Sequence, residues 1–232
     1  MKADELAGKY HGDMAGTYDE LREGTTQWAN ENAIVEGLLS RLPPGTSVLD
    51  VPVGTGRFLS TYAARDFKVT GVDVSSAMLA KARRKAQQIA LDAYLSEGSA
   101  YALEFRDDAF DAVVSIRFLD WVEPQHLGAI LSELTRVCRR DLIVYVPTFT
   151  PISELLRHPG GLVRLLRQLK LRAYRRRVRS DAVVHNRTAL LTLFKRLGLI
   201  TIEKVCIDRA DAPLWQRGVD RDIYLLSKPS DA

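Results

Sequence analysis

The amino-acid sequence predicts an α/β fold in which helices cover both faces of a mostly parallel sheet. After about residue 45, short apolar runs alternate with longer helical patterns, which is typical of strand and helix units in such a sheet. The 232 residues, 46% hydrophobic and 27% charged, suit one domain with a sizeable core. We predict seven strands, at residues 47–53, 68–74, 93–97, 110–116, 142–146, 199–207 and 222–226.

Helices are predicted before and between these strands, at residues 26–42, 57–64, 77–89, 124–138 and 188–197. The segment Pro43-Pro44-Gly45 ends the first helix, Ser75 or Ser76 suits the N-cap of the third, and Gly198 closes the last. Only about fifteen residues join the last two strands, a length that favours an antiparallel pair over another crossover helix.

Composition excludes several classes of protein. No run approaches the roughly 20 apolar residues of a membrane span. Asp4 and Glu5 stand where a signal peptide would be apolar, so we expect a cytoplasmic protein. The two cysteines, Cys138 and Cys206, are too few for a disulfide framework, and no Cys/His spacing indicates a metal site.

A glycine-containing loop follows the first strand, in the segment VLDVPVGTGRF at residues 48–58. Gly54 and Gly56 would let the backbone pass close to a ligand, while free N–H groups at the following helix start could bind it. The second strand ends in GVDVS, which places Asp73 at a strand tip where its carboxylate can accept both hydroxyls of a ribose. The glycine-containing loop, followed by an acid at the tip of the next strand, predicts a nucleotide-like ligand.

Over nearly its whole length the chain resembles the class I S-adenosylmethionine-dependent methyltransferases. Four family blocks occur in order: LDVPVGTG at 49–56, Asp73 with Met78 behind it, Gly98-Ser99-Ala100, and FDAVVSIRFLDWV at 110–122. The resemblance implies a Rossmann-like seven-stranded sheet with an antiparallel last strand, S-adenosylmethionine (SAM) as cofactor and S-adenosylhomocysteine (SAH) as product. It implies cofactor contacts from Tyr18, Arg22, Asp50, Pro52, Gly54, Gly56, Arg57, Asp73, Val74, Met78, Ser99, Ala100 and Arg117.

Two residues depart from the family pattern. Pro52 occupies the first glycine position of the loop and offers no N–H, so we expect Gly54 and Gly56 to provide the close approach to the ligand. Ser99 replaces the usual Asp, which weakens the expected contact with the adenine amino group. A dinucleotide-binding oxidoreductase is the rival interpretation of the loop, but it would need a third glycine near Leu59.

Candidate catalytic residues are few. Asp120 follows the fourth strand and could act as a general base on an acceptor hydroxyl, or could instead cap the helix that begins at Pro124. His158 and His185 are further base candidates because they flank the expected mouth of the site. Tyr18 and Arg22 are one helical turn apart and could close over the methionine end of the donor.

Basic charge is concentrated in one segment. Residues 151–187 carry ten Lys or Arg against two acidic residues, a net charge of +8 within a chain of +4. The segment is interpreted first as a lid over the substrate pocket; the alternatives are a peripheral membrane helix at 160–180, a nucleic-acid surface, or a plain solvated helical hairpin. The acidic remainder of the chain and the single interleaved aromatic, Tyr174, disfavour nucleic acid.

The sequence therefore predicts one methyltransferase domain over residues 1–232, with an N-terminal helical cap at 1–44 and a basic insertion at 148–187. We expect it to transfer a methyl group from SAM to an oxygen or nitrogen of a small-molecule acceptor, anionic or lipid-linked. The alternative is a non-catalytic module of the same fold that docks on RNA or membrane. Neither the acceptor nor the oligomeric state follows from the sequence.

Overall fold

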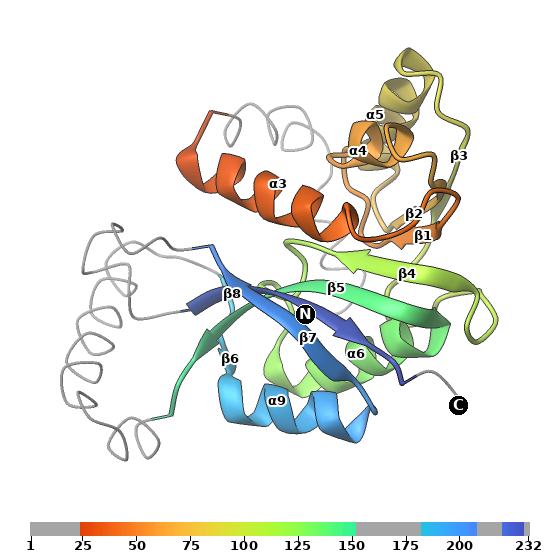
Figure 1. Cartoon of the computed structure of the whole chain (residues 1–232). Coiled ribbons are helices and arrows are strands. Elements are labelled where there is room, and N and C mark those ends of the chain that lie inside the picture. The colour runs from red at the N-terminus through yellow and green to blue at the C-terminus, as the bar shows by residue number, and fades with distance from the viewer. Residues whose placement is uncertain (1–23, 152–181, 208–219, 230–232) are drawn as a thin grey trace.

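The structure is a computed structural model that describes residues 24–151, 182–207 and 220–229 (Figure 1). Its strands are β1 (Ser47–Asp50), β2 (Lys68–Asp73), β3 (Ala93–Glu97), β4 (Phe110–Ser115), β5 (Cys138–Phe149), β6 (His185–Asn186), β7 (Ile200–Cys206) and β8 (Asp220–Ser227). Its helices are α3 (Thr26–Leu39), α4 (Leu59–Ala63), α5 (Ser76–Gln88), α6 (Pro124–Val137) and α9 (Arg187–Arg196). None of these helices is long and apolar enough to cross a membrane.

The strands form one mixed sheet in the order β3-β2-β1-β4-β5-β8-β7, with β6 paired to β5. Strands β1 to β5 pair in parallel, whereas β8 is antiparallel to both β5 and β7. The predicted α/β fold with an antiparallel last strand is thus confirmed. The strand order reverses between β1 and β4, and this is the point at which open α/β sheets bind ligands beyond their strand tips.

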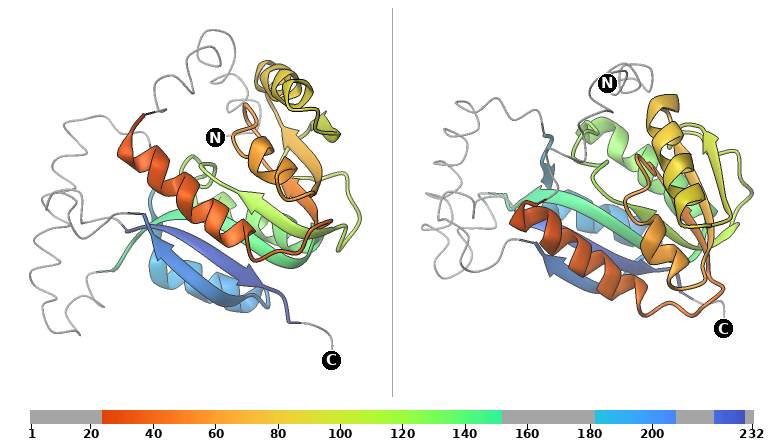
Figure 2. Two further views of the ribbon diagram at one scale, coloured as in Figure 1. Left: turned by 45° about the horizontal axis from the view of Figure 1, so that its top comes forward. Right: turned by 90° about the horizontal axis from the view of Figure 1, so that it is seen from above.

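Helices cover both faces of the sheet, with α3, α4 and α5 on one side and α6 and α9 on the other (Figures 1 and 2). Each strand contributes side chains to a hydrophobic core on either face of the sheet, because successive side chains point to opposite faces. Val48 and Ala112 are buried with α3, α4 and α5, while their neighbours Leu49 and Val113 are buried with α6 and α9.

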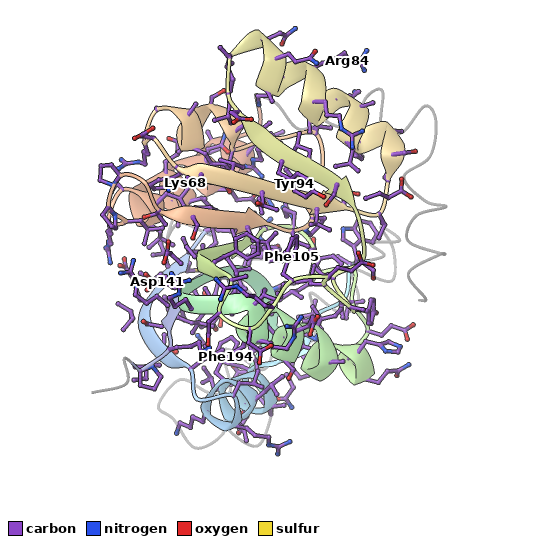
Figure 3. All side chains as sticks on the ribbon, turned by 90° about the vertical axis from the view of Figure 1, so that its right-hand side faces the viewer. Lys68, Arg84, Tyr94, Phe105, Asp141 and Phe194 are labelled. Carbon is purple, nitrogen blue, oxygen red and sulfur yellow. The ribbon has the colours of Figure 1, made fainter. Side chains whose placement is uncertain are left out.

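Side chains fill the layers between sheet and helices, as Figure 3 shows from the side. Phe194 of α9 meets Tyr224 edge to face, with ring centroids 5.4 Å apart. Tyr94, on the edge strand β3, is 64% exposed, whereas the central strands β1 and β4 are almost wholly buried. The most buried strands, β1 and β4, are therefore the two between which the strand order reverses.

Three differences from the sequence prediction bear on the site. Helix α4 begins only at Leu59, because Phe58 before it has a φ of −98° and a ψ of 4°, outside the helical range. Strand β5 runs on to Phe149, since β8 pairs with it from Asp141 to Thr148. Strand β6 was not predicted, because a two-residue His-Asn segment carries no strand pattern; it pairs with Thr148 and Phe149. The first residue of the predicted insertion, Thr148, thus lies in β5, and His185 and Asn186 near its other end form β6.

Candidate active site

A pocket of about 1010 Å³, its open mouth included, lies beyond the tips of β1, β2 and β4. It brings together most of the residues that the sequence predicted for the cofactor: Asp50, Pro52, Gly54, Arg57, Asp73, Val74, Met78, Ser99, Ala100 and Arg117. Trp28, Phe58, Tyr101, Phe118 and Trp121 add aromatic surface. Tyr18, Arg22 and His158 lie outside the described residues.

Asp73 ends β2 and is held by backbone groups. One of its carboxylate oxygens accepts the Gly54 N–H at 2.8 Å, and the other accepts the Ser75 N–H at 2.8 Å. Burial raises the pKa of Asp73, an effect that these backbone N–H groups oppose. A carboxylate offers about four acceptor positions, so Asp73 can still accept a hydroxyl group from a ligand.

Asp50 ends β1 beneath the loop. Its carboxylate accepts a hydrogen bond from the Tyr62 hydroxyl of α4 at 3.1 Å. Burial raises the pKa of Asp50 to about 7, although the Tyr62 hydrogen bond lowers it. A cationic group in the pocket would favour the ionised carboxylate.

The two glycines of the loop have different roles. Gly54 has a φ of +55°, and a Cβ added there would meet nothing within 4 Å, which leaves its pocket face open to a ligand. Gly56 packs inward, where an added Cβ would lie 2.5 Å from Leu59 Cδ1 and 3.3 Å from Ala82 Cα. Gly56 does not line the pocket and allows the loop to pack against α4 and α5; its contact with a ligand stays a prediction.

The far side of the pocket, next to Asp73, is formed by α5 and the turn after β3. Ser75 caps α5 as predicted, with its Oγ accepting the Met78 N–H at 3.3 Å. The Oγ of Ser99 accepts the Tyr101 N–H at 3.3 Å, and Ser99 bridges to Ala102. These contacts hold an apolar slot of Val74, Met78 and Ala100 with a polar rim at Ser99.

Helix α3 closes the near side of the pocket through Arg57. The guanidinium donates from Nε to Asn32 Oδ1 at 2.7 Å, from Nη1 to Glu31 Oε2 at 3.0 Å, and from Nη2 to the Trp28 carbonyl at 3.1 Å. It also lies 3.4 Å from the centroid of the Trp28 ring, within cation–π range.

Arg117 reaches the same helix from the loop after β4. Its backbone is left-handed, with a φ of +59°, a conformation that costs a non-glycine residue roughly 1 kcal/mol. The side chain forms a two-point ion pair with Glu31, Nη2 to Oε1 at 2.9 Å and Nε to Oε2 at 3.2 Å. Its Nη1 lies 3.5 Å from Asp120 and 3.4 Å from the Tyr145 hydroxyl.

The structure places two of the candidate bases, Asp120 and His185, away from the pocket lining. Asp120 is 4% exposed and its carboxylate pairs with Arg117, so its charge is directed at that guanidinium. It does not cap α6, whose N-cap is Glu123. His185 is 1% exposed beneath the loop, where its Nε2 donates to the Leu119 carbonyl at 2.7 Å, and it lines a groove between α6 and α9. Burial lowers the pKa of His185, which keeps the ring neutral.

Sequence reasoning missed the side chains that build the near wall. Trp28, Glu31, Asn32 and Tyr145 belong to no sequence motif. The one available signal was Glu31 itself, a charged residue on the apolar face of the predicted first helix, where it is fully buried. No group of three or more His, Cys, Asp or Glu is placed to hold a metal ion in the part of the chain described.

Comparison with known proteins agrees with this geometry. Residues 48–141 match a family model described as a methyltransferase domain. A phosphatidylethanolamine N-methyltransferase of Cereibacter sphaeroides is 41% identical over 99 residues, which cover 41% of this chain and 47% of that protein. A malonyl-(acyl-carrier protein) O-methyltransferase of Pectobacterium atrosepticum is 33% identical over 148 residues, covering 62% and 54% respectively. The matches thus span about half the length of these curated relatives.

A solved structure extends the likeness in fold to the whole chain. Magnesium protoporphyrin IX methyltransferase from Synechocystis PCC 6803, with SAH bound, superposes with a TM-score of 0.72 at 14% identity, covering 98% of this chain and 100% of that one. At this identity the likeness concerns the fold alone. Residues 48–141 thus match a methyltransferase domain, within a chain that has the fold of the class I SAM-dependent methyltransferases.

Proposed function

We propose that this protein transfers a methyl group from SAM to an oxygen or nitrogen atom of a small-molecule acceptor and releases SAH. The observation that carries the proposal is Asp73, a buried carboxylate at the tip of β2 that two backbone N–H groups aim into the pocket beside an open glycine loop. This arrangement suits a ribose with two free hydroxyls, next to an apolar slot of the kind an adenine ring fills.

Each pocket residue then has a proposed role towards the donor. Asp73 accepts the ribose hydroxyls, and Asp50 with Gly54 holds the methionine end. Val74, Met78 and Ala100 contact the adenine ring, with Ser99 at its polar edge. Pro52 offers no N–H and shapes the loop only. Tyr18 and Arg22 stay predictions for the methionine end.

The donor supplies an electrophilic methyl group on a sulfonium, which a lone pair of the acceptor displaces in line. Catalysis of this kind depends mainly on positioning and exclusion of water, so no elaborate set of acids and bases is required. Trp28, Phe118 and Trp121 provide an apolar surface around Arg117 at the mouth. We assign Asp120 and His185 to stabilising the loop after β4 rather than to proton abstraction. The Asp120 carboxylate pairs with Arg117, and His185 donates to the Leu119 carbonyl. His158 stays a candidate base.

For the acceptor, we propose a lipid-linked or anionic molecule. Two features support this: the segment at 151–187 carries a net charge of +8, and one relative is by name a phosphatidylethanolamine N-methyltransferase. Arginine and lysine side chains bind phosphate and carboxylate groups well. We include in this proposal that the segment at 151–187 acts as a lid over the pocket or as a membrane contact.

Calorimetric titration with SAH tests the donor site. We expect saturable 1:1 binding by the wild-type protein and at least a ~30-fold loss in Asp73→Ala, since two charge-assisted hydrogen bonds disappear. Asp92→Ala is the matched control, because Asp92 is exposed before β3, and it should bind like wild type. No binding by wild type, or unchanged binding by Asp73→Ala, would contradict the proposal.

A methyl-release screen tests the reaction itself. Donor labelled in the methyl group is incubated with pools of phospholipids, small carboxylic and phosphorylated molecules, and RNA, and transfer is followed by product extraction. Label is expected in the lipid or anionic pool and is expected to disappear in Asp73→Ala. Transfer into RNA alone would overturn the proposed acceptor class but not the methyltransferase activity.

A further inference from the structure

Glu31 lies at the centre of an ion-pair network that the cofactor motifs do not contain. It is fully buried in α3 and accepts hydrogen bonds from Gln27 Nε2 at 3.0 Å and Arg57 Nη1 at 3.0 Å. Arg117 adds its bonds from Nη2 at 2.9 Å and Nε at 3.2 Å. One carboxylate thus joins two arginines that come from different loops.

Both arginines form part of the pocket wall. Arg57 follows the glycine loop and Arg117 follows β4, and their side chains are 12% and 20% exposed. With Glu31 and Asp120 ionised, the four side chains carry two positive and two negative charges, so the wall is neutral as a whole. Without Glu31, a net positive charge would face the pocket from a partly buried position, where solvent screens it weakly.

A neutral wall matters because the two ligands of the proposed reaction differ in charge. SAM carries a positive sulfonium, whereas the sulfur of SAH is neutral; apart from the methyl group the two molecules are the same. Any electrostatic contribution of the wall therefore changes the affinity for SAM relative to SAH, while contacts with the adenosine and the amino acid end affect both ligands alike.

We propose that Glu31 is a positioning residue that holds Arg57 and Arg117 across the pocket and neutralises them, so that the site accepts a sulfonium cation. The inference rests on the proposed function, because it assumes SAM as the ligand. Glu31 sets the preference between charged donor and neutral product by its charge, and sets the shape of the wall by its hydrogen bonds.

Isothermal titration of Glu31→Gln with SAM and with SAH, in the absence of acceptor, separates these effects. Gln keeps the shape and one acceptor oxygen but removes the charge. A unit charge about 10 Å away at an effective dielectric constant of about 20 changes affinity on the order of tenfold. We expect the ratio of SAM to SAH affinity to fall by about that factor. Glu36→Gln is the matched control, since Glu36 is exposed on the same helix and bonds Thr61; its ratio should stay within about twofold.

Two further variants extend the test, and the first of them keeps the proposal testable if Glu31→Gln folds poorly. Arg57→Met removes a positive charge, so the affinity ratio should shift in favour of SAM. In Glu31→Gln/Arg117→Gln the wall regains its charge balance, and the ratio should return towards wild type although more hydrogen bonds are lost. Equal weakening of both ligands in all variants would overturn the electrostatic role of Glu31. Failure of wild type to bind either ligand would instead contradict the proposed function.

Discussion

The two sides of the pocket are built in different ways. On the far side, Asp50, Gly54 and Asp73 lie close together in the sequence, and Asp73 is held by backbone N–H groups. On the near side, side chains hold side chains: Arg117 reaches Glu31 across 86 residues of sequence, and Arg57 reaches it across 26. The far side thus forms where the adjacent strands β1 and β2 end, whereas the near side exists only when α3 and the loop after β4 are packed together.

This difference predicts different sensitivities. Changes on the far side should act through backbone geometry or through the charge of Asp50, and should affect the donor whichever acceptor is used. Changes on the near side should act through the network of buried charges and the loop that carries Arg117. Four tests, at Gly56, Asp50, His185 and Ser99, examine this division, and their expected effects decrease in that order.

The largest effect is expected from Gly56→Val. Its Cβ would lie 2.5 Å from the buried Leu59 side chain, at a φ of +81°. We expect the free energy of unfolding to fall by about 3 kcal/mol, which lowers Tm by roughly 6–12 °C. Thermal unfolding measures this. Gly54→Ala should cost only about 1 kcal/mol because its Cβ meets open space, but should weaken SAH binding. Equal Tm losses in the two variants would show that the glycines do not divide their roles.

Asp50 should make donor binding depend on pH. Burial raises its pKa to about 7, so the carboxylate is protonated in the empty protein below that pH. We expect SAH affinity to fall as pH drops from 8 to 6, by up to about tenfold per unit below the pKa.

The stability of the ligand-free protein should change with pH in the opposite direction. Because the folded protein holds a proton that the unfolded chain releases, the free energy of unfolding of the ligand-free protein should fall as pH rises from about 4 to 7.

The control for this pH dependence is Asp50→Asn, which should lose the binding trend and show a smaller stability trend, because the pKa of Asp73 is also raised. Tyr62→Phe should shift the binding profile to higher pH, because the Tyr62 hydroxyl lowers the pKa of Asp50. Affinity that is the same at pH 6 and pH 8 in the wild-type protein would rule out Asp50 as a charged contact of the ligand.

His185→Phe probes the loop on the near side. The substitution leaves the Leu119 carbonyl without its 2.7 Å hydrogen bond, which costs about 1–2 kcal/mol. We expect Tm to fall by roughly 2–8 °C and SAH affinity to fall two- to threefold, through displacement of the loop that carries Arg117. His185→Gln, whose amide can still donate, should recover part of both losses. A large loss of SAH affinity with unchanged Tm would instead indicate direct contact between His185 and the ligand.

The smallest effect is expected from Ser99→Asp, which adds an acceptor at the proposed adenine edge. Donor and product affinities should rise together by about two- to fivefold, since one hydrogen bond contributes about 0.5–1 kcal/mol. Calorimetry with both ligands measures this. A change in only one of them would contradict a contact with the adenine, which the two ligands share.

Prediction from the sequence worked best where periodicity and local motifs decide the outcome. The strands and helices of the core lie within a few residues of their predicted positions, and the Ser75 cap of α5 is confirmed. The roles of Gly54 and Gly56 were not separable, because both have positive φ and only the neighbours Leu59 and Ala82 distinguish them. Strand β6 carries no pattern of its own and exists through pairing with Thr148 and Phe149.

By itself, the sequence determined the α/β fold, the loop between β1 and α4, and the acid at the tip of β2, because alternation, turn glycines and strand tips are local features. Only the tertiary structure decided which charges meet. Glu31, Arg57 and Arg117 carry no shared spacing, and a buried carboxylate is stable only with partners that packing brings within hydrogen-bond distance. The same packing directed Asp120 and His185 to the loop after β4, away from the base role that their positions in the sequence favoured.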